Sequence, residues 1–115
     1  MTKPHKETER LHHMLDAARE AVQFTKGKKR SDLDLNHQLT LALTRLIEIL
    51  GEAARHVSSY TRQKYSRIPW KEIAGTRDRL IHGYFDVDLD ILWQIVSRDL
   101  PPLIGELEKM LSKYE

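Results

Sequence analysis

The segment from Arg77 to Tyr84, which reads RDRLIHGY, carries side chains that could act on a phosphodiester. A guanidinium such as that of Arg77 offers a fork of donors to a phosphate and can stabilise the extra charge of a phosphorane-like transition state. An imidazole such as that of His82 has an ordinary pKa of about 6.5, so it can exchange a proton near neutral pH. The ring of Tyr84 adds a hydroxyl donor or a stacking surface for a base. Together these groups could cleave RNA without a metal, with the ribose 2′-hydroxyl attacking its own phosphodiester.

If residues 77–84 lie on one helix, their spacing fixes which of them are neighbours. Arg77 and Tyr84 would share a face, and Asp78 and His82, four apart, would be neighbours, so that the carboxylate could hold one imidazole nitrogen. Arg77 and His82 would differ by about 140° around the axis. Long arginine reach, unwinding near Gly83 or a second copy of the segment could bring them together. The alternative is structural, because arginine and histidine near a helix C-terminus also favour the macrodipole.

Other candidate sites are weaker. His12, His13 and Asp16 include an i, i+4 pair, but no third strong metal ligand stands at a matching spacing, so no metal site is predicted. Glu48 and Glu52 are interpreted as a surface pair rather than a catalytic one. Two basic runs are either solvated loops or, if RNA binds, contacts for its phosphates; they comprise Lys26, Lys28, Lys29 and Arg30, and then Arg62, Lys64 and Arg67.

The composition fits one small helical domain over residues 1–115. Apolar residues make up 40% of the chain, and 19 Lys and Arg stand against 17 Asp and Glu, for a net charge of +2. This mild excess neither requires nor excludes a polyanionic partner. No cysteine is present, and the N-terminal segment lacks the apolar stretch of a signal peptide, so we expect a cytoplasmic protein. The most apolar stretch, LTLALTRLIEIL, contains Arg45 and Glu48, which predicts a core helix rather than a membrane span.

Helical periodicity extends over nearly the whole chain, and no strand pattern is seen. The first helix is expected from about Glu7 to Thr25, ended by Gly27. A second should begin near Asp32 and continue to about Val57. Its apolar face is wider than a surface helix needs, which suggests a second burial surface against another subunit. Gly51 within it indicates either close approach of another helix or a tolerated glycine.

The second half should add two further helices. Residues 58–66 are predicted to be a loop or frayed turn, followed by a helix from Pro69 to His82. Asp88 should cap the last helix, which Pro101 and Pro102 should kink or break before it continues to about Leu111. The predicted fold is therefore all-α, an antiparallel bundle of four to five helices.

These residues also resemble a known family. Arg77, His82 and Tyr84 form the order R-x-x-x-x-H-x-Y, with the polar Asp78 directly after the arginine. Around them stand IPWKEIAGTRDRLIHGYFDVDLDILWQIV, DLPPL and LIEILGEAARHVS. The chain resembles the HEPN superfamily, and within it the HepT-like toxins of MNT–HEPN toxin–antitoxin systems. The resemblance extends from MLDAAREAVQFTKG to the final helix.

The resemblance implies a homodimeric helical bundle in which the motif helices of both protomers meet in a cleft. It implies a metal-independent endoribonuclease toxin without a cofactor, in which Arg77 and His82 are the catalytic pair and Asp78 supports them. The implied antitoxin is a small nucleotidyltransferase (MNT) that transfers AMP from ATP to Tyr84, which would block the cleft and repel RNA. Many relatives carry a larger residue where Gly83 stands. The glycine is expected to loosen the end of this helix and so to leave the direction of Tyr84 less well defined.

Two other functions are compatible with the same residues. HEPN-like bundles also serve as non-catalytic partners that hold a nucleotide or substrate for a nucleotidyltransferase, and Arg77 and His82 would then contact ATP phosphates. The chain could also be a plain helical dimerisation protein in which these residues are replaceable.

Overall fold

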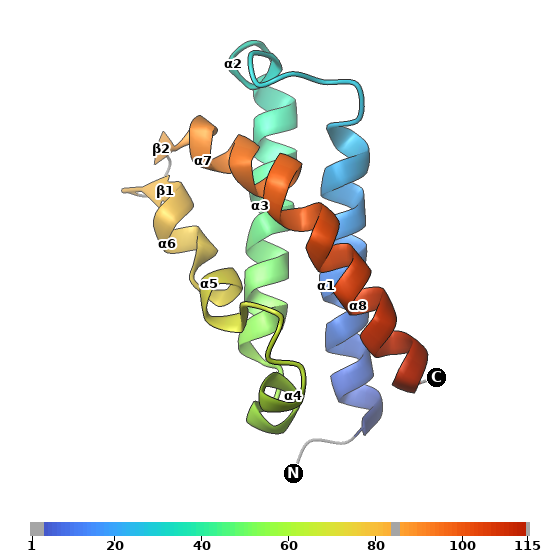
Figure 1. The fold of residues 1–115 in the computed structure, drawn as a ribbon. Coiled ribbons are helices and arrows are strands. Elements are labelled where there is room, and N and C mark those ends of the chain that lie inside the picture. Colours follow the sequence, from blue (N-terminus) through green and yellow to red (C-terminus); the bar gives the residue numbers. More distant parts are fainter. Residues whose placement is uncertain (1–3, 84–85, 115) are drawn as a thin grey trace.

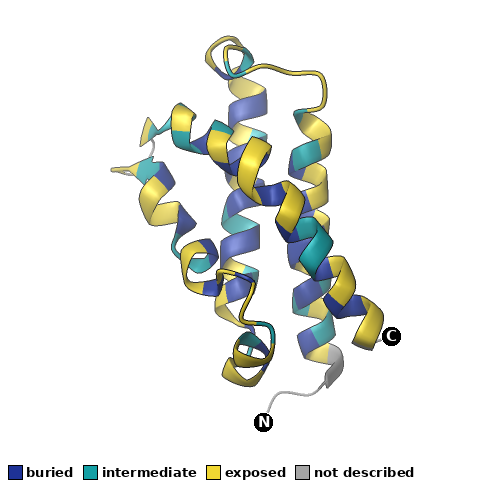
Figure 2. Cartoon of the chain, viewed as in Figure 1, coloured by how far each residue is buried: buried dark blue, intermediate teal, exposed yellow. Residues whose placement is uncertain are grey.

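Two long antiparallel helices form the centre of the molecule. The computed structural model describes residues 4–83 and 86–114. Helix α1 (Pro4–Phe24) and helix α3 (His37–Arg55) lie side by side, and α8 (Leu100–Tyr114) crosses in front of α1 (Figure 1). The prediction for the first helix is confirmed to within a few residues, and Gly27 follows it with a φ of 75°. Buried residues recur along these helices (Figure 2). Most of the described chain is helical, so the all-α prediction is confirmed.

The second predicted helix is divided in two near its start. Helix α2 (Asp32–Leu35) is a single turn, and Asn36 then caps α3 by accepting a hydrogen bond from the Leu39 amide at 3.0 Å. Asn36 has extended backbone angles, as an N-cap requires, and therefore cannot continue the preceding turn. The predicted start near Asp32 is thus the start of α2, and the long helix begins five residues later.

Residues predicted as a loop form a short helix instead. Helix α4 (Ser59–Lys64) begins after Ser58, whose hydroxyl accepts a hydrogen bond from the Thr61 amide. The buried carboxylate of Glu7, on α1, accepts hydrogen bonds from the Ser58 amide and from the hydroxyls of Ser58 and Thr61. Burial raises the pKa of Glu7, but these hydrogen bonds and the charge of Arg10 outweigh it and lower the pKa. An ionised Glu7 therefore joins α1 to the N-terminus of α4.

The predicted helix over residues 69–82 is wrong in its extent. The chain forms α5 (Trp70–Ala74), a break at Gly75, and α6 (Thr76–Leu80). Ile81 is extended (φ −111°, ψ 121°) and starts β1 (Ile81–His82), which pairs antiparallel with β2 (Asp86–Val87). Gly83 has a φ of 73°, a conformation that glycine adopts without strain and that turns the chain back. A two-residue strand is too short to show alternation, which explains why the sequence pattern did not reveal it.

The helix does not break at Pro101 and Pro102, but its regular winding changes to a π-helical turn just before them. Asp88 caps α7 (Leu89–Gln94), as predicted, accepting from the Ile91 amide at 3.1 Å. The π-helix η1 (Ile95–Asp99) follows and runs directly into α8, and the Leu100 amide donates to the Ile95 carbonyl, five residues back. Proline lacks an amide hydrogen and its ring clashes with the carbonyl four residues earlier. A wider turn just before Pro101 accommodates both effects without ending the helix.

Gly51 is where the second half of the chain comes closest to α3. A Cβ at this buried position would stand 3.0 Å from the Ile73 carbonyl oxygen and 3.7 Å from that of Ala74. The C-terminal end of α5 therefore lies directly on the backbone of α3. Of the two interpretations for this glycine, close approach is confirmed, although the approaching helix belongs to the same chain.

Replacing Gly51 tests this close approach. Gly105 lies in α8 with nothing within 4 Å of an added Cβ, so Gly105→Ala should raise the free energy of unfolding by up to about 1 kcal/mol. Gly51→Ala should fall short of that gain, and Gly51→Leu should lower the free energy of unfolding by about 1–3 kcal/mol through overpacking. Urea denaturation measures all three. Equal stabilisation by alanine at both positions would contradict the close approach.

Candidate functional site

Arg77 is held at one edge and open at the other. On α6, its Nε donates to Oε2 of Glu48 on α3 at 2.9 Å, and the arginine side chain is 60% exposed whereas that of Glu48 is 27% exposed. Within residues 4–83 and 86–114, the two terminal nitrogens of Arg77 make no recorded hydrogen bond or ion pair. The guanidinium is therefore oriented by one carboxylate while its outer donors remain available to an anion.

One stripe of α3 positions Arg77. Glu48, Gly51 and Arg55 follow one another at three and four residues and so share a face. Glu48 binds Arg77, Gly51 admits the end of α5, and Arg55 donates to the Ala74 carbonyl at 3.5 Å. The same stripe thus fixes the joint between α5 and α6 and the first turn of α6.

His82 lies beyond the end of α6, on β1. Its side chain is exposed, and it is paired in register with Asp86 of β2. Because α6 ends at Leu80, the expected helical contact between Asp78 and His82 is wrong. Among the described residues, no hydrogen bond joins these two side chains, and Asp78 is exposed on α6. The angle of about 140° expected between Arg77 and His82 on one helix likewise does not apply.

The fourth predicted site residue, Tyr84, lies outside the described residues. Gly83, directly before it, makes the turn between β1 and β2. The chain therefore brings Arg77 and His82 onto consecutive short elements, α6 and β1, rather than onto one continuous helix.

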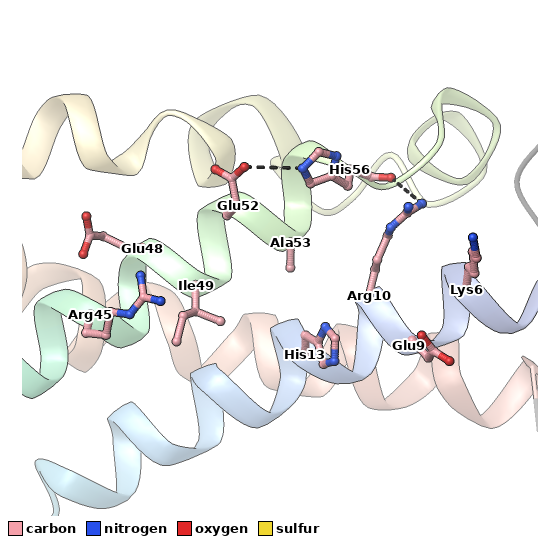
Figure 3. A pocket seen from close by; sticks show the side chains of 10 residues that line it. All are labelled: Lys6, Glu9, Arg10, His13, Arg45, Glu48, Ile49, Glu52, Ala53 and His56. Carbon is pink, nitrogen blue, oxygen red and sulfur yellow. Dashed lines mark hydrogen bonds and ion pairs between the residues drawn. The ribbon is translucent and has the colours of Figure 1, made fainter.

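A cavity between α1 and α3 adjoins the Arg77 contact. It has a volume of about 470 Å³, and in Figure 3 α8 passes behind α1, so the cavity is on the face away from α8. Glu48 belongs both to this cavity and to the Arg77 ion pair. The cavity is lined by Lys6, Glu9, Arg10, His13, Arg45, Glu48, Ile49, Glu52, Ala53 and His56. Partly buried Ile49 and Ala53 are part of the extra apolar width seen in the sequence.

The two acidic residues that α3 contributes to this cavity, Glu48 and Glu52, have different partners. Glu48 binds Arg77, whereas Glu52 lies 3.3 Å from Nε2 of His56, whose carbonyl accepts from Arg10 at 3.0 Å (Figure 3). The interpretation of Glu48 and Glu52 as a plain surface pair therefore missed a residue that orients Arg77. The i, i+4 acidic pair was the visible signal, but its partner is 29 residues away in sequence.

Two general findings bear on other kinds of site. In the described part of the chain, no three His, Asp or Glu side chains are grouped in a way that could hold a metal ion. No helix among the described residues is both long and apolar enough to cross a membrane.

Comparison with known proteins places this arrangement in context. The family described as "Ribonuclease HepT-like" matches residues 14–110. "Putative RNase MJ1380" of Methanocaldococcus jannaschii is 38% identical over 98 residues, which are 85% of this chain and 90% of that protein. "Putative RNase TTE0752" of Caldanaerobacter subterraneus subsp. tengcongensis is 38% identical over 103 residues, 90% of this chain and 92% of the relative.

A relative from Thermococcus cleftensis has a more explicit name. "Probable ribonuclease HepT" is 34% identical over 110 residues, covering 96% of this chain and 98% of its own length. No solved structure gave a significant match.

The contact between Glu48 and Arg77 can be tested by nuclear magnetic resonance. The Arg77 Nε–H signal should be shifted and exchange slowly with water in the wild type, because its hydrogen is engaged by the carboxylate. Glu48→Gln should weaken these effects, Glu48→Ala should abolish them, and Glu52→Ala, the control four residues away, should leave them unchanged. Because the pair is partly exposed, a double-mutant cycle should give a coupling of about 0.2–1 kcal/mol. An Arg77 signal insensitive to Glu48→Ala would contradict the contact.

Proposed function

This chain belongs to the family of HepT-like ribonucleases, and we propose that it is the RNA-cleaving toxin subunit of a toxin–antitoxin pair. One observation carries the proposal beyond family membership. Arg77 donates a hydrogen bond from its Nε to Glu48, which leaves its terminal nitrogens available to an anion. The imidazole of His82 is exposed on the next element, β1. This is the donor set that phosphodiester cleavage needs.

In the proposed reaction, the imidazole of one His82 removes the proton of a ribose 2′-hydroxyl. The 2′-oxygen forms a bond to the adjacent phosphorus, and the bond from phosphorus to the 5′-oxygen breaks. A second imidazole, protonated, gives its proton to the leaving 5′-oxygen, which yields a 2′,3′-cyclic phosphate and a 5′-hydroxyl. Arg77 stabilises the phosphorane charge through its terminal nitrogens. No step in this scheme needs a metal.

The scheme needs two imidazoles, and a homodimer would supply them. Each chain has a single His82. Arg77 and His82 lie on consecutive short elements, α6 and β1, and both side chains are exposed. We place the second His82 on a partner copy, so that the cleft between the two copies holds the RNA. Asp78 is exposed on α6, and in this proposal it supports the site from that position across the interface rather than through its own His82.

The toxin would be neutralised at Tyr84. An MNT antitoxin would transfer AMP from ATP to its hydroxyl, placing an anion and a bulky base near Arg77 and His82. Gly83, directly before Tyr84, is exposed and has a positive φ, so the chain lies at the surface just before the acceptor residue. The added phosphate would pair with the open donors of Arg77 and exclude an RNA phosphate from them.

Replacing His82 is the decisive test of cleavage. His82→Ala should lower the rate of cutting of a labelled RNA by about 10²–10⁴-fold, the range for loss of a general acid–base group. Arg77→Ala should also lose activity, whereas His37→Ala, which alters another exposed histidine, should not. The assay contains a chelator, and the product ends are identified as cyclic phosphate and 5′-hydroxyl.

Other outcomes would identify the competing functions. If purified wild type never cuts RNA and His82→Ala weakens only ATP binding, the chain is a nucleotide-holding partner of a nucleotidyltransferase. If both variants behave as wild type in every assay, the motif residues are replaceable and the nuclease proposal fails.

Replacing Tyr84 tests neutralisation. Incubation with ATP and an MNT antitoxin should add AMP to the wild-type chain, as read by intact-mass spectrometry, and should stop RNA cleavage. Tyr84→Phe lacks the accepting hydroxyl and should remain unmodified and uninhibited. Tyr60→Phe, at an exposed tyrosine elsewhere in the chain, should be modified like the wild type. Transfer of AMP to Tyr84→Phe would show that the acceptor lies elsewhere.

A further inference from the structure

Two further cavities lie beside the α5–α6 segment, apart from the cavity that Glu48 lines. Their volumes are about 270 and 190 Å³, and both are lined by Arg67, Ile68 and Glu106, so they adjoin. The larger is lined by residues of α5 and α6, of η1 and α8, and by Leu50 of α3. We refer to the two cavities together as the α6–α8 groove.

The α6–α8 groove is more cationic than the chain as a whole. Six basic residues line it, against the three acidic residues Glu72, Asp99 and Glu106, and Glu106 is already within 3.5 Å of Lys109. The basic residues are Lys64, Arg67, Arg79, Arg98, Lys109 and Lys113. In the part of the chain that the structure describes, the three arginines have no recorded ion pair, although all three are exposed. Unpaired guanidiniums along a groove suit a ligand with repeated negative charge.

Aromatic rings stand at one end of the groove. The Nζ of Lys64 lies 5.9 Å from the ring centre of Tyr60 and 5.7 Å from that of Tyr65, and the Nζ of Lys113 lies 5.8 Å from Tyr65. These cation–π contacts hold the lysines beside the rings. Tyr60 is 71% exposed, so its ring is open to stacking. An exposed aromatic ring beside cations is the combination that binds single-stranded nucleic acid without regard to sequence.

From these features we propose that the α6–α8 groove binds a single-stranded stretch of the substrate RNA outside the cleavage site. The phosphates contact the arginines, and a base stacks on Tyr60. Arg98 and Lys113 are 15 residues apart on η1 and α8, or about 22 Å at the helical rise, which is enough for about six stacked nucleotides. Arg79, at the other wall, is two residues from Arg77 and so lies on nearly the opposite side of α6; a strand leaving the groove reaches the cleavage site by passing around this short helix.

This inference rests on the proposed ribonuclease function, so binding is measured apart from cleavage. The probe is a 5′-fluorescein-labelled twelve-nucleotide polyuridine, titrated by anisotropy with the full chain carrying His82→Ala. Adding Arg67→Gln and Arg98→Gln should weaken binding on the order of 10-fold and reduce the slope of log affinity against log salt by about 1.4, which is about 0.7 for each lost phosphate contact. Tyr60→Ala should weaken binding by about 5- to 100-fold through lost stacking.

The matched control removes the same charge from the other basic run. Lys26→Gln with Lys28→Gln should change affinity and salt slope much less than the arginine pair. If both double variants lost the same RNA affinity, binding would depend on net charge rather than on the groove, and the proposal would be overturned. Unchanged RNA binding by the groove variants would also overturn it. Circular dichroism confirms that each variant is folded.

Two further outcomes keep this inference distinct from the nuclease proposal. If wild type does not cut RNA but the groove variants still lose polyuridine binding, the groove is supported and the nuclease fails. If the groove variants bind polyuridine normally but lose binding of an acidic amphipathic helical peptide, the groove belongs to a protein partner and the RNA proposal is overturned.

Discussion

The close approach of the Ile73 carbonyl to Gly51 is the contact on which the candidate site depends. A Cβ at position 51 would stand 3.0 Å from this oxygen, so any side chain larger than that of glycine requires the end of α5 to move away from α3. With α5 seated there, α6 begins after the single residue Gly75 and places Arg77 against Glu48, one helical turn along the same stripe of α3. A glycine in a helix lowers stability by roughly 1 kcal/mol relative to alanine. Here that cost accompanies the positioning of the guanidinium.

Much of the fold was predictable because long helices leave a strong periodic signal. The first helix, the cap at Asp88 and the all-α class were predicted correctly from local spacing. The errors fall where one or two residues decide the outcome. Asn36 caps α3, Ser58 starts α4 with help from distant Glu7, and extended Ile81 ends the motif helix early. The Glu7 contact is tertiary, and the cap at Asn36 rests on one local hydrogen bond, so the periodicity of apolar residues contains neither.

The site shows the same division between local and distant information. Arg77 and His82 could be selected from residue types and from their order in the chain. Their relative placement could not, because the predicted helix ends before His82 and changes the direction of the backbone. Glu48 could not be assigned as the partner of Arg77, since only folding brings positions 29 residues apart together. Of the basic residues of the α6–α8 groove, only Lys64 and Arg67 were seen as part of a run in the sequence. Folding adds the others from α6, η1 and α8 to the same surface.

The π-helical turn fixes the relation between the two halves of the last helical segment. It contains one more residue than an α-helical turn, and Leu92, Val96 and Leu100, spaced by four, are all buried across it. If the same residues were wound as an α-helix, everything beyond residue 99 would be rotated by about 100°. Arg98 and the apolar face of α8 could not then both keep their present directions. Homologous chains that lack one residue of this segment should therefore form a plain α-helical turn there and direct α8 as it is directed here.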